Sequence, residues 1–253
     1  MRLTKHVYLV GSGDSGFRLS ADADCNVYLI ASATGELGLI DSGSGLATDI
    51  ILKQIIAEGF DPSKIKIIFC THAHPDHAGG IYELRKLLGC IVALPDAEAT
   101  GFEAHDEAAL GLIEARRAGI YGPEYSFRTC HVDYRVQHKD EFTIGELRIT
   151  AIHVPSHSVG STCYLLQEGQ QGRKSLFSGD VIFADGRLGL LNCQGSSLEN
   201  YRKYLSRLRG LDIDALFPGH YRFVLNNGQK DIDKACQILE TSLFIPPTVK
   251  DCC

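Results

Sequence analysis

The sequence predicts an α/β (α+β) protein whose two halves have a similar order of elements. Short apolar runs rich in β-branched residues alternate with longer runs in which apolar residues recur every three or four positions. These two periods indicate strands and helices, respectively. Strands come first and helices follow, and this order occurs twice. The chain has 253 residues, 44% of them hydrophobic, so we predict one large core and a single domain over residues 1–253.

The first half is predicted to open with antiparallel strands separated by Gly- and Asp-rich turns. Its strands are expected at residues 7–10, 26–31, 37–40, 65–70 and 90–94. Its helices are expected at residues 46–58, 81–88 and 96–119. Gly59 directly follows the first helix and is typical of a C-cap. The aromatic, turn-prone segment 121–127 is predicted to form a loop that shapes a substrate pocket.

The second half repeats this order. Its strands are expected at residues 140–149 as a hairpin, then at 150–154, 163–167, 175–178 and 215–217. A helix is predicted over residues 197–209, with Ser196 and Glu199 as a capping box and Gly210 as the C-cap. A last amphipathic helix has one apolar face, formed by Ile232, Ala235, Cys236 and Leu239.

Four potential metal ligands lie close together in the turn between a predicted strand and a predicted helix: His72, His74, Asp76 and His77. His72 and His74 are two positions apart in extended chain and can point to the same side. Pro75 then turns the chain, so Asp76 and His77 can face a second point nearby. Imidazole and carboxylate ligands suit zinc, iron or manganese better than calcium or magnesium. One structural zinc is the alternative, but such sites usually draw on thiolates.

Four further residues of these ligand types each follow a predicted strand: Asp41, His157, Asp180 and His220. Residues at strand ends can meet at one edge of a sheet, so these four are candidate members of the same site. Asp41 is expected to orient a metal-binding imidazole from behind, although Asp-Ser-Gly is also a good turn sequence. By contrast, residues 105–107 are interpreted as a solvated helix face, and Cys70 as part of a strand core.

The composition bounds the partners and the compartment. A net charge of −6 and a pI near 5.9 argue against nucleic acid and anionic membranes, so we expect a small-molecule substrate. A homodimer is kept as the alternative to a monomer. Nine cysteines without regular spacing suggest reduced thiols and a cytoplasmic protein. The N-terminal apolar run is too short for a signal peptide, and Cys252 and Cys253 are expected to be exposed thiols without an assigned role.

Taken together, these motifs resemble the metallo-β-lactamase superfamily, in particular its glyoxalase II and lactonase branch. The HxHxDH motif is matched by His72, His74, Asp76 and His77. The remaining motifs are matched, in order along the chain, by Asp41, His157, Ser-Gly-Asp at Asp180 and Pro-Gly-His at His220. The resemblance implies an αββα sandwich of two mixed sheets with helices on the outer faces.

The resemblance also implies two divalent metal ions, with zinc favoured and iron or manganese as alternatives. The first ion would be held by His72, His74 and His157. The second would be held by Asp76, His77 and His220. Asp180 would bridge both ions, and Asp76 would orient the nucleophile or carry a proton, so Asp76 and Asp180 are the expected catalytic residues.

The implied function is that of a dinuclear metallohydrolase, in which a hydroxide shared by the two metals attacks a small ester, lactone or thioester. No serine nucleophile is needed, so Ser156, Ser158 and Ser161 are interpreted as loop structure. Related lactonases place a Tyr where this chain has Phe183, and Tyr221 is either a substitute or a packing residue. The alternatives are a mono-iron oxidoreductase similar to persulfide dioxygenases, a metal-dependent phosphodiesterase and a non-catalytic metal-binding module.

Overall fold

The structure is a computed structural model that describes residues 1–241 and 246–248, so Cys252 and Cys253 lie outside the described residues. The chain divides into a first unit, residues 1–136, and a second unit, residues 137–252. Each unit contains one large sheet with its own helices and its own apolar core. A single domain spanning both units stays a prediction.

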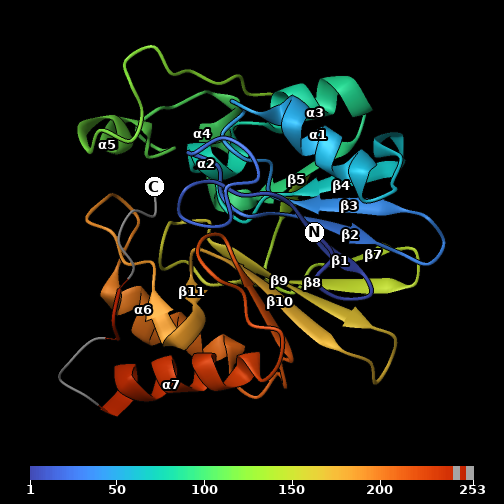
Figure 1. Ribbon diagram of the computed structural model, residues 1–253. Coiled ribbons are helices and arrows are strands. Elements are labelled where there is room, and N and C mark those ends of the chain that lie inside the picture. Colours follow the sequence, from blue (N-terminus) through green and yellow to red (C-terminus); the bar gives the residue numbers. More distant parts are fainter. Residues whose placement is uncertain (242–245, 249–253) are drawn as a thin grey trace. The chain divides into compact units, whose positions relative to one another are not determined.

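The first unit is built on a six-stranded sheet in sequence order (Figure 1). Its strands are β1 (Val7–Gly11), β2 (Val27–Ala31), β3 (Leu37–Ile40), β4 (Ile65–Phe69), β5 (Ile91–Pro95) and β6 (Tyr134–Val136). The pairs β1–β2 and β2–β3 are antiparallel, which confirms the predicted antiparallel start. From β3 to β6 the pairs are parallel, and parallel neighbours need crossover connections.

Those crossovers are supplied by short helices. They are α1 (Thr48–Ala57), α2 (Pro75–Ala78), α3 (Ile81–Leu88), α4 (Asp96–Glu103) and α5 (Leu112–Arg117), with a 3₁₀ turn at Pro62–Lys64. Apolar side chains of α1, α3 and α4 pack with the sheet in one core cluster. The single helix predicted over residues 96–119 is wrong, because the chain turns after α4 and Gly111 has a φ of +71° before α5 begins.

The aromatic segment after α5 is packed rather than open. Tyr121, Tyr125 and Phe127 are all buried in the core of the first unit, and the first two rings stack with centroids 3.9 Å apart. The Tyr125 hydroxyl donates to the carbonyl of Ser44 at 2.8 Å. A role of this segment in shaping a substrate pocket stays a prediction.

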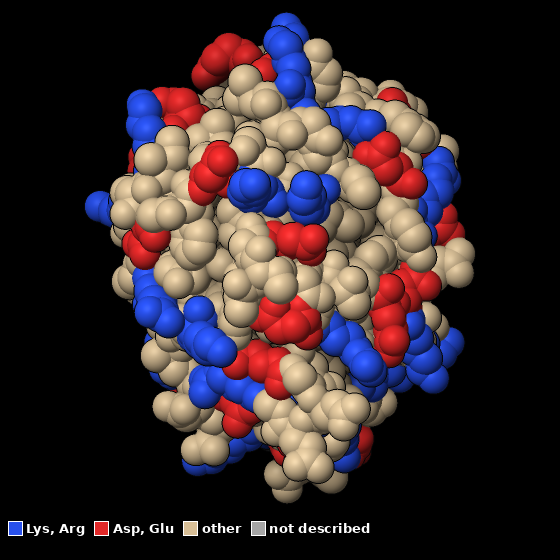
Figure 2. Space-filling model, turned by 90° about the vertical axis from the view of Figure 1, so that its right-hand side faces the viewer, with Lys and Arg blue, Asp and Glu red and all other residues tan. Residues whose placement is uncertain are grey.

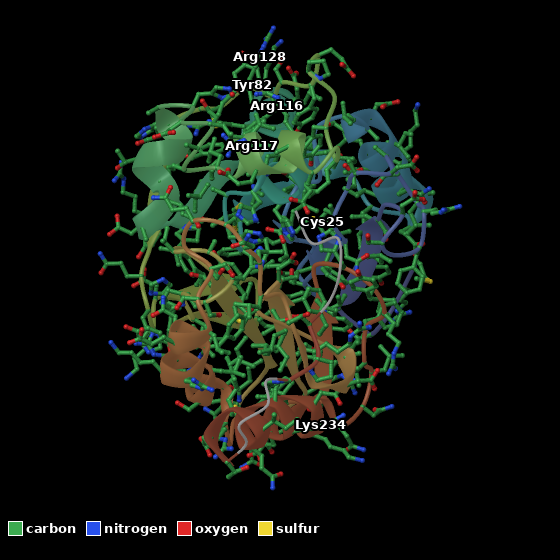
Figure 3. The ribbon with its side chains drawn as sticks, turned by 90° about the vertical axis from the view of Figure 1, so that its left-hand side faces the viewer. Cys25, Tyr82, Arg116, Arg117, Arg128 and Lys234 are labelled. Carbon is green, nitrogen blue, oxygen red and sulfur yellow. The ribbon has the colours of Figure 1, made fainter. Side chains whose placement is uncertain are left out.

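Arginines lie beside this segment (Figure 3). Arg116 forms an ion pair with Glu107 at 2.6 Å and donates to the carbonyl of Tyr125. The Arg128 guanidinium lies over the ring of Tyr82, 5.4 Å from its centroid. Arg116 thus connects α5 to the aromatic segment. Arg128, which follows that segment, contacts α3, since Tyr82 belongs to that helix.

The second unit is built on a five-stranded sheet in the order β13-β10-β9-β8-β7. Its strands are β7 (Glu141–Ile144), β8 (Leu147–His153), β9 (Thr162–Glu168), β10 (Lys174–Gly179) and β13 (Ala215–Pro218). Only β13 is parallel to its neighbour, and the other pairs are antiparallel. A small hairpin of β11 (Ile182–Phe183) and β12 (Arg187–Leu188) follows β10, joined by a 3₁₀ turn at Ala184–Gly186.

Helices of the second unit cover one face of its sheet. They are α6 (Leu198–Tyr204), which continues into a 3₁₀ turn at Leu205–Leu208, and α7 (Gly228–Thr241). The predicted apolar face of α7 is confirmed, since its four residues are buried in the core of this unit. The predicted cap at Ser196 is wrong by one position. Ser197 accepts from the Asn200 amide, whereas Ser196 Oγ accepts from Leu191.

The described helices include none that is long and apolar enough to cross a membrane. On the face shown in Figure 2, basic and acidic side chains are interspersed rather than gathered by sign.

The core of the second unit gives a stability prediction. Ile232 on α7 is fully buried, so Ile232→Ala is expected to lower the free energy of unfolding by about 2–5 kcal/mol through the cavity it leaves. Lys234 is exposed on the same helix. Lys234→Ala should change the free energy of unfolding by less than about 0.5 kcal/mol. Urea unfolding followed by circular dichroism measures both. Equal effects of the two variants would contradict the packing described here.

Candidate metal centre

The first histidine pair lies directly after β4 in the first unit. His72 Nε2 and His74 Nδ1 are 3.1 Å apart, and the two rings meet edge to face. Two nitrogen ligands of one tetrahedral zinc, with bonds of about 2.0–2.1 Å, lie about 3.3 Å apart. The separation of these two nitrogens therefore fits two ligands of one ion.

A short helix places the next two ligand candidates beside that pair. His74 is the N-cap residue of α2 and Pro75 its first helical residue, a position that proline favours. One turn then presents Asp76 and His77, whose Oδ2 and Nε2 atoms are 3.2 Å apart. The His77 ring lies 4.1 Å from the His72 ring, centroid to centroid. The first unit thus brings two donor pairs side by side, and all four side chains are buried.

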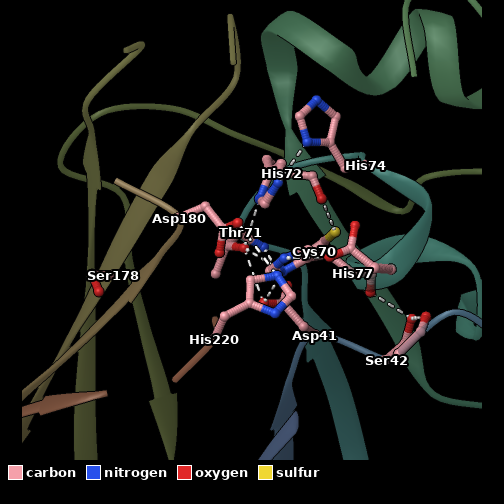
Figure 4. Close-up of polar contacts among 12 residues, drawn as sticks. Asp41, Ser42, Cys70, Thr71, His72, His74, His77, Ser178, Asp180 and His220 are labelled. Atoms are coloured by element: carbon pink, nitrogen blue, oxygen red, sulfur yellow. Dashed lines mark hydrogen bonds and ion pairs between the residues drawn. The ribbon is translucent and has the colours of Figure 1, made fainter. Parts of the chain in front are cut away.

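One carboxylate orients two of these imidazoles (Figure 4). Asp41, at the end of β3, accepts from the amide of Thr71 at 2.7 Å, from its hydroxyl at 2.9 Å and from His77 Nδ1 at 2.8 Å. Because the Thr71 hydroxyl donates to Asp41, it accepts from His72 Nδ1, which lies 3.1 Å away. Both rings therefore carry their proton on Nδ1, which leaves Nε2 as the nitrogen that could bind a metal.

Ser42, the residue after Asp41, holds helix α2 through hydrogen bonds to its backbone. The Ser42 amide and hydroxyl both donate to the carbonyl of His77, at 2.9 and 2.7 Å. The Ser42 hydroxyl in turn accepts from the amide of Gly80. His77 is therefore fixed both at its ring and at its carbonyl. Thr71 and Ser42 were not predicted, although each is directly adjacent to a predicted site residue.

Two buried thiols lie behind these ligands. Donor atoms of Cys25, Asp41 and His77 lie within 4.8 Å of one another. Burial raises the pKa of the Cys25 thiol far above its usual range. Burial likewise raises the pKa of Cys70, whose Sγ donates to the carbonyl of His72 at 2.8 Å. Cys70 lies one residue beyond β4 and not in the strand, but it is fully buried in the core of the first unit.

The second unit gathers the remaining three ligand candidates. His157 follows β8, Asp180 follows β10 and His220 follows β13, and all three are buried. The same oxygen, Asp180 Oδ2, lies 3.9 Å from His157 Nε2 and 3.4 Å from His220 Nε2. An oxygen between two imidazole nitrogens suits a carboxylate that bridges two ions.

Close packing fixes the orientation of His157. Its Nδ1 donates to the carbonyl of Gly189 at 2.6 Å, which leaves Nε2 as the nitrogen that could bind a metal. A Cβ atom at Gly189 would lie 2.0 Å from the Asp180 carbonyl oxygen and 3.0 Å from His157 Nδ1. In the first unit, Gly111 has the same relation to His74, since a Cβ there would lie 3.0 Å from its ring. Neither glycine was predicted, because only the fold brings each one against its histidine.

Comparison with known proteins identifies the family. Residues 21–220 match the family described as the metallo-beta-lactamase superfamily. The chain belongs to this superfamily. A subclass B3 metallo-beta-lactamase of Bradyrhizobium japonicum, BJP-1, is similar in structure, with a TM-score of 0.66 and 25% sequence identity over 87% of this chain and 76% of that one. The metallo-β-lactamase fold predicted from the motifs is therefore confirmed.

Two curated superfamily relatives are thioesterases by name. The acyl-coenzyme A thioesterase MBLAC2 of Bos taurus is 26% identical over 215 residues, which cover 78% of this chain and 72% of that protein. The atrochrysone carboxyl ACP thioesterase of Aspergillus fumigatus is 27% identical over 206 residues, which cover 81% of this chain. The match spans 53% of the length of the fungal protein.

Other polar residues near the superfamily motifs serve the local structure. Ser161 Oγ accepts from the Ser158 amide and bonds its hydroxyl, both at 2.9 Å, so these serines shape the loop after His157. Asp106 accepts from two amides of the turn before α5. The Tyr221 ring packs edge-on against Phe183, with centroids 5.8 Å apart, which favours its interpretation as a packing residue.

The glycine beside His157 gives a second prediction. Gly189→Ala should lower zinc affinity by about 10- to 100-fold, because the added methyl displaces two ligands at once. Competition with a chromophoric chelator measures this affinity. Gly101→Ala is the control, since its Cβ would meet only the Ala109 side chain, at 3.0 Å. Unchanged affinity in Gly189→Ala would show that the loop yields without moving the ligands.

Proposed function

We propose that the protein is a metal-dependent hydrolase of acyl thioesters that binds two divalent ions with ligands from both units. His72, His74 and His157 would hold the first ion, and Asp76, His77 and His220 the second, with Asp180 shared. Nitrogen and carboxylate donors of this kind favour zinc, with iron and manganese as the alternatives. Support comes from membership of the superfamily and from the donor geometry within each unit.

The observation that carries this proposal is the position of the Asp180 carboxylate. Its Oδ2 lies within 4 Å of Nε2 atoms that the proposal assigns to different ions. Asp180 is buried, and buried carboxylates are usually paired or bound to a metal, because burying a charge is costly. Divalent ions at this carboxylate would lower that cost.

The reaction needs an activated water and a stabilised carbonyl oxygen. Divalent ions, when bound, lower the pKa of a water toward neutrality and polarise a carbonyl. Asp76 Oδ2 lies 3.2 Å from His77 Nε2. The Asp76 carboxylate would accept the proton of the attacking water. Ser158 and Ser161 bond to each other within their loop, which argues against a serine nucleophile.

Thioesters are the proposed substrates for two reasons. Two superfamily relatives are thioesterases that act on acyl groups carried by coenzyme A and by ACP, according to their names. A thiol also has a pKa of about 8.5, far below the value of about 15.7 for water, so a thiolate leaves with little help from a proton donor. The acidic chain further favours a small-molecule substrate over nucleic acid or a membrane surface.

Two ligand variants test the proposal. His74→Ala and Asp180→Asn are each expected to lower acyl-thioester hydrolysis by more than about 100-fold, since direct ligands matter more than the groups behind them. Both should keep the far-ultraviolet circular dichroism of the parent, because the core of each unit is apolar. Release of free thiol from acyl-coenzyme A measures the activity. His105→Ala is the control, as its ring lies against Phe127 in the first unit.

A substrate panel run on protein of measured metal content separates the alternatives. Thioesters should be cleaved faster than lactones, β-lactams and phosphodiesters at two metal equivalents per chain. Full activity with a single iron, accompanied by oxygen uptake on a persulfide, would replace the proposal with an oxidoreductase. Loss of cooperative folding in both ligand variants would show that the metals are structural.

A further inference from the structure

A buried glutamate on α4 contacts the backbone between the first two metal-ligand candidates. Glu98 is only 6% exposed, and glutamate is rarely buried without a partner. Its Oε2 accepts from the amide of Ala73 at 2.7 Å. Glu98 was not predicted from the sequence, because residues 98 and 73 meet only when α4 packs beside the end of β4.

The amide of Ala73 sits at a sensitive point. It belongs to the peptide bond between His72 and Ala73, and Ala73 connects His72 to His74, whose facing nitrogens are 3.1 Å apart. The carbonyl of the same peptide group is held as well, since the oxygen of His72 accepts from Cys70 Sγ. Metal ligands must lie within about 0.2 Å of their ideal distances. Rotation of this backbone would therefore separate the two nitrogens beyond what one ion tolerates.

We propose that Glu98 is a positioning residue for the first metal ion, acting through its hydrogen bond to Ala73. This inference rests on the proposed assignment of His72 and His74 to one ion. The carboxylate holds the backbone while the rings are oriented separately, His72 by Thr71 and His74 by its contact with Gly111. The hydrogen bond from the Ala73 amide to Glu98 is what supports metal binding. For that bond, the length of the side chain matters more than its charge.

Three variants of Glu98 separate reach from charge. Glu98→Gln keeps an oxygen at the same reach and loses the charge. Glu98→Asp keeps the charge and shortens the side chain by one methylene, so its carboxylate no longer reaches Ala73. Glu98→Ala removes both. Zinc affinity of the metal-depleted full chain, measured by competition with a chromophoric chelator, should fall about 10- to 100-fold in Glu98→Ala and Glu98→Asp. In Glu98→Gln it should stay within about threefold of the parent.

Glu103 provides a matched control on the same helix. Its Oε1 accepts from the amide of Val132 at 2.9 Å, so Glu103→Ala also removes a carboxylate-to-amide bond made by α4. Both alanine variants should lower the Tm of the metal-free protein. Only Glu98→Ala should lower zinc affinity as well. A purely structural role of Glu98 predicts that the two variants lose stability alike and that both keep the affinity of the parent.

Several outcomes would overturn the inference. Parental zinc affinity in Glu98→Asp or in folded Glu98→Ala would overturn it. Equal losses of zinc affinity in Glu98→Ala and Glu103→Ala would also overturn it. Weaker binding in Glu98→Gln than in Glu98→Asp would assign the effect to charge instead of reach. If Glu98→Ala does not fold, the Gln and Asp variants still decide. Zinc affinity is measured without substrate, so a failure of the thioester assignment is seen separately in the substrate panel.

Discussion

The hydrogen bonds accepted by Asp41 are the constraint on which the ligand candidates of the first unit depend. One buried carboxylate fixes the proton of His77 directly and that of His72 through the Thr71 hydroxyl. An imidazole binds a metal only through a nitrogen without a proton, so the tautomer decides whether these rings can act. Asp41 has a φ of +61°, a conformation that aspartate tolerates better than most residues. The turn that ends β3 thus serves the ligands that follow β4.

In the second unit, a backbone carbonyl fixes the tautomer of a histidine. The Gly189 carbonyl fixes the proton of His157, and the missing side chain of Gly189 leaves room for both His157 and Asp180. The unit's three ligand candidates follow three different strands of one sheet. A sheet places strand ends reproducibly, whereas a long loop would not hold a carboxylate oxygen near two imidazole nitrogens.

Stability and metal binding are separable in this architecture. Each unit has its own apolar cluster, formed by residues of its sheet and of the helices that cover it. The polar network around the ligands is buried, and its members are tied to backbone amides and carbonyls, as Ser42 and Cys70 show. Such a network limits the motion of the ligands before any ion arrives, so little ordering remains to oppose binding.

The sequence by itself determined the fold class, most strands, the apolar face of α7 and the candidate ligands, because these depend on local periodicity and residue chemistry. Only the tertiary structure decided where the helix after β5 breaks, which serine caps α6, and which groups stand behind the ligands. Thr71, Gly189 and Glu98 carry no motif that marks them. Gly189 meets His157, Glu98 meets the Ala73 backbone and Thr71 meets Asp41 only because packing brings distant segments of the chain together. Local sequence patterns do not encode that packing.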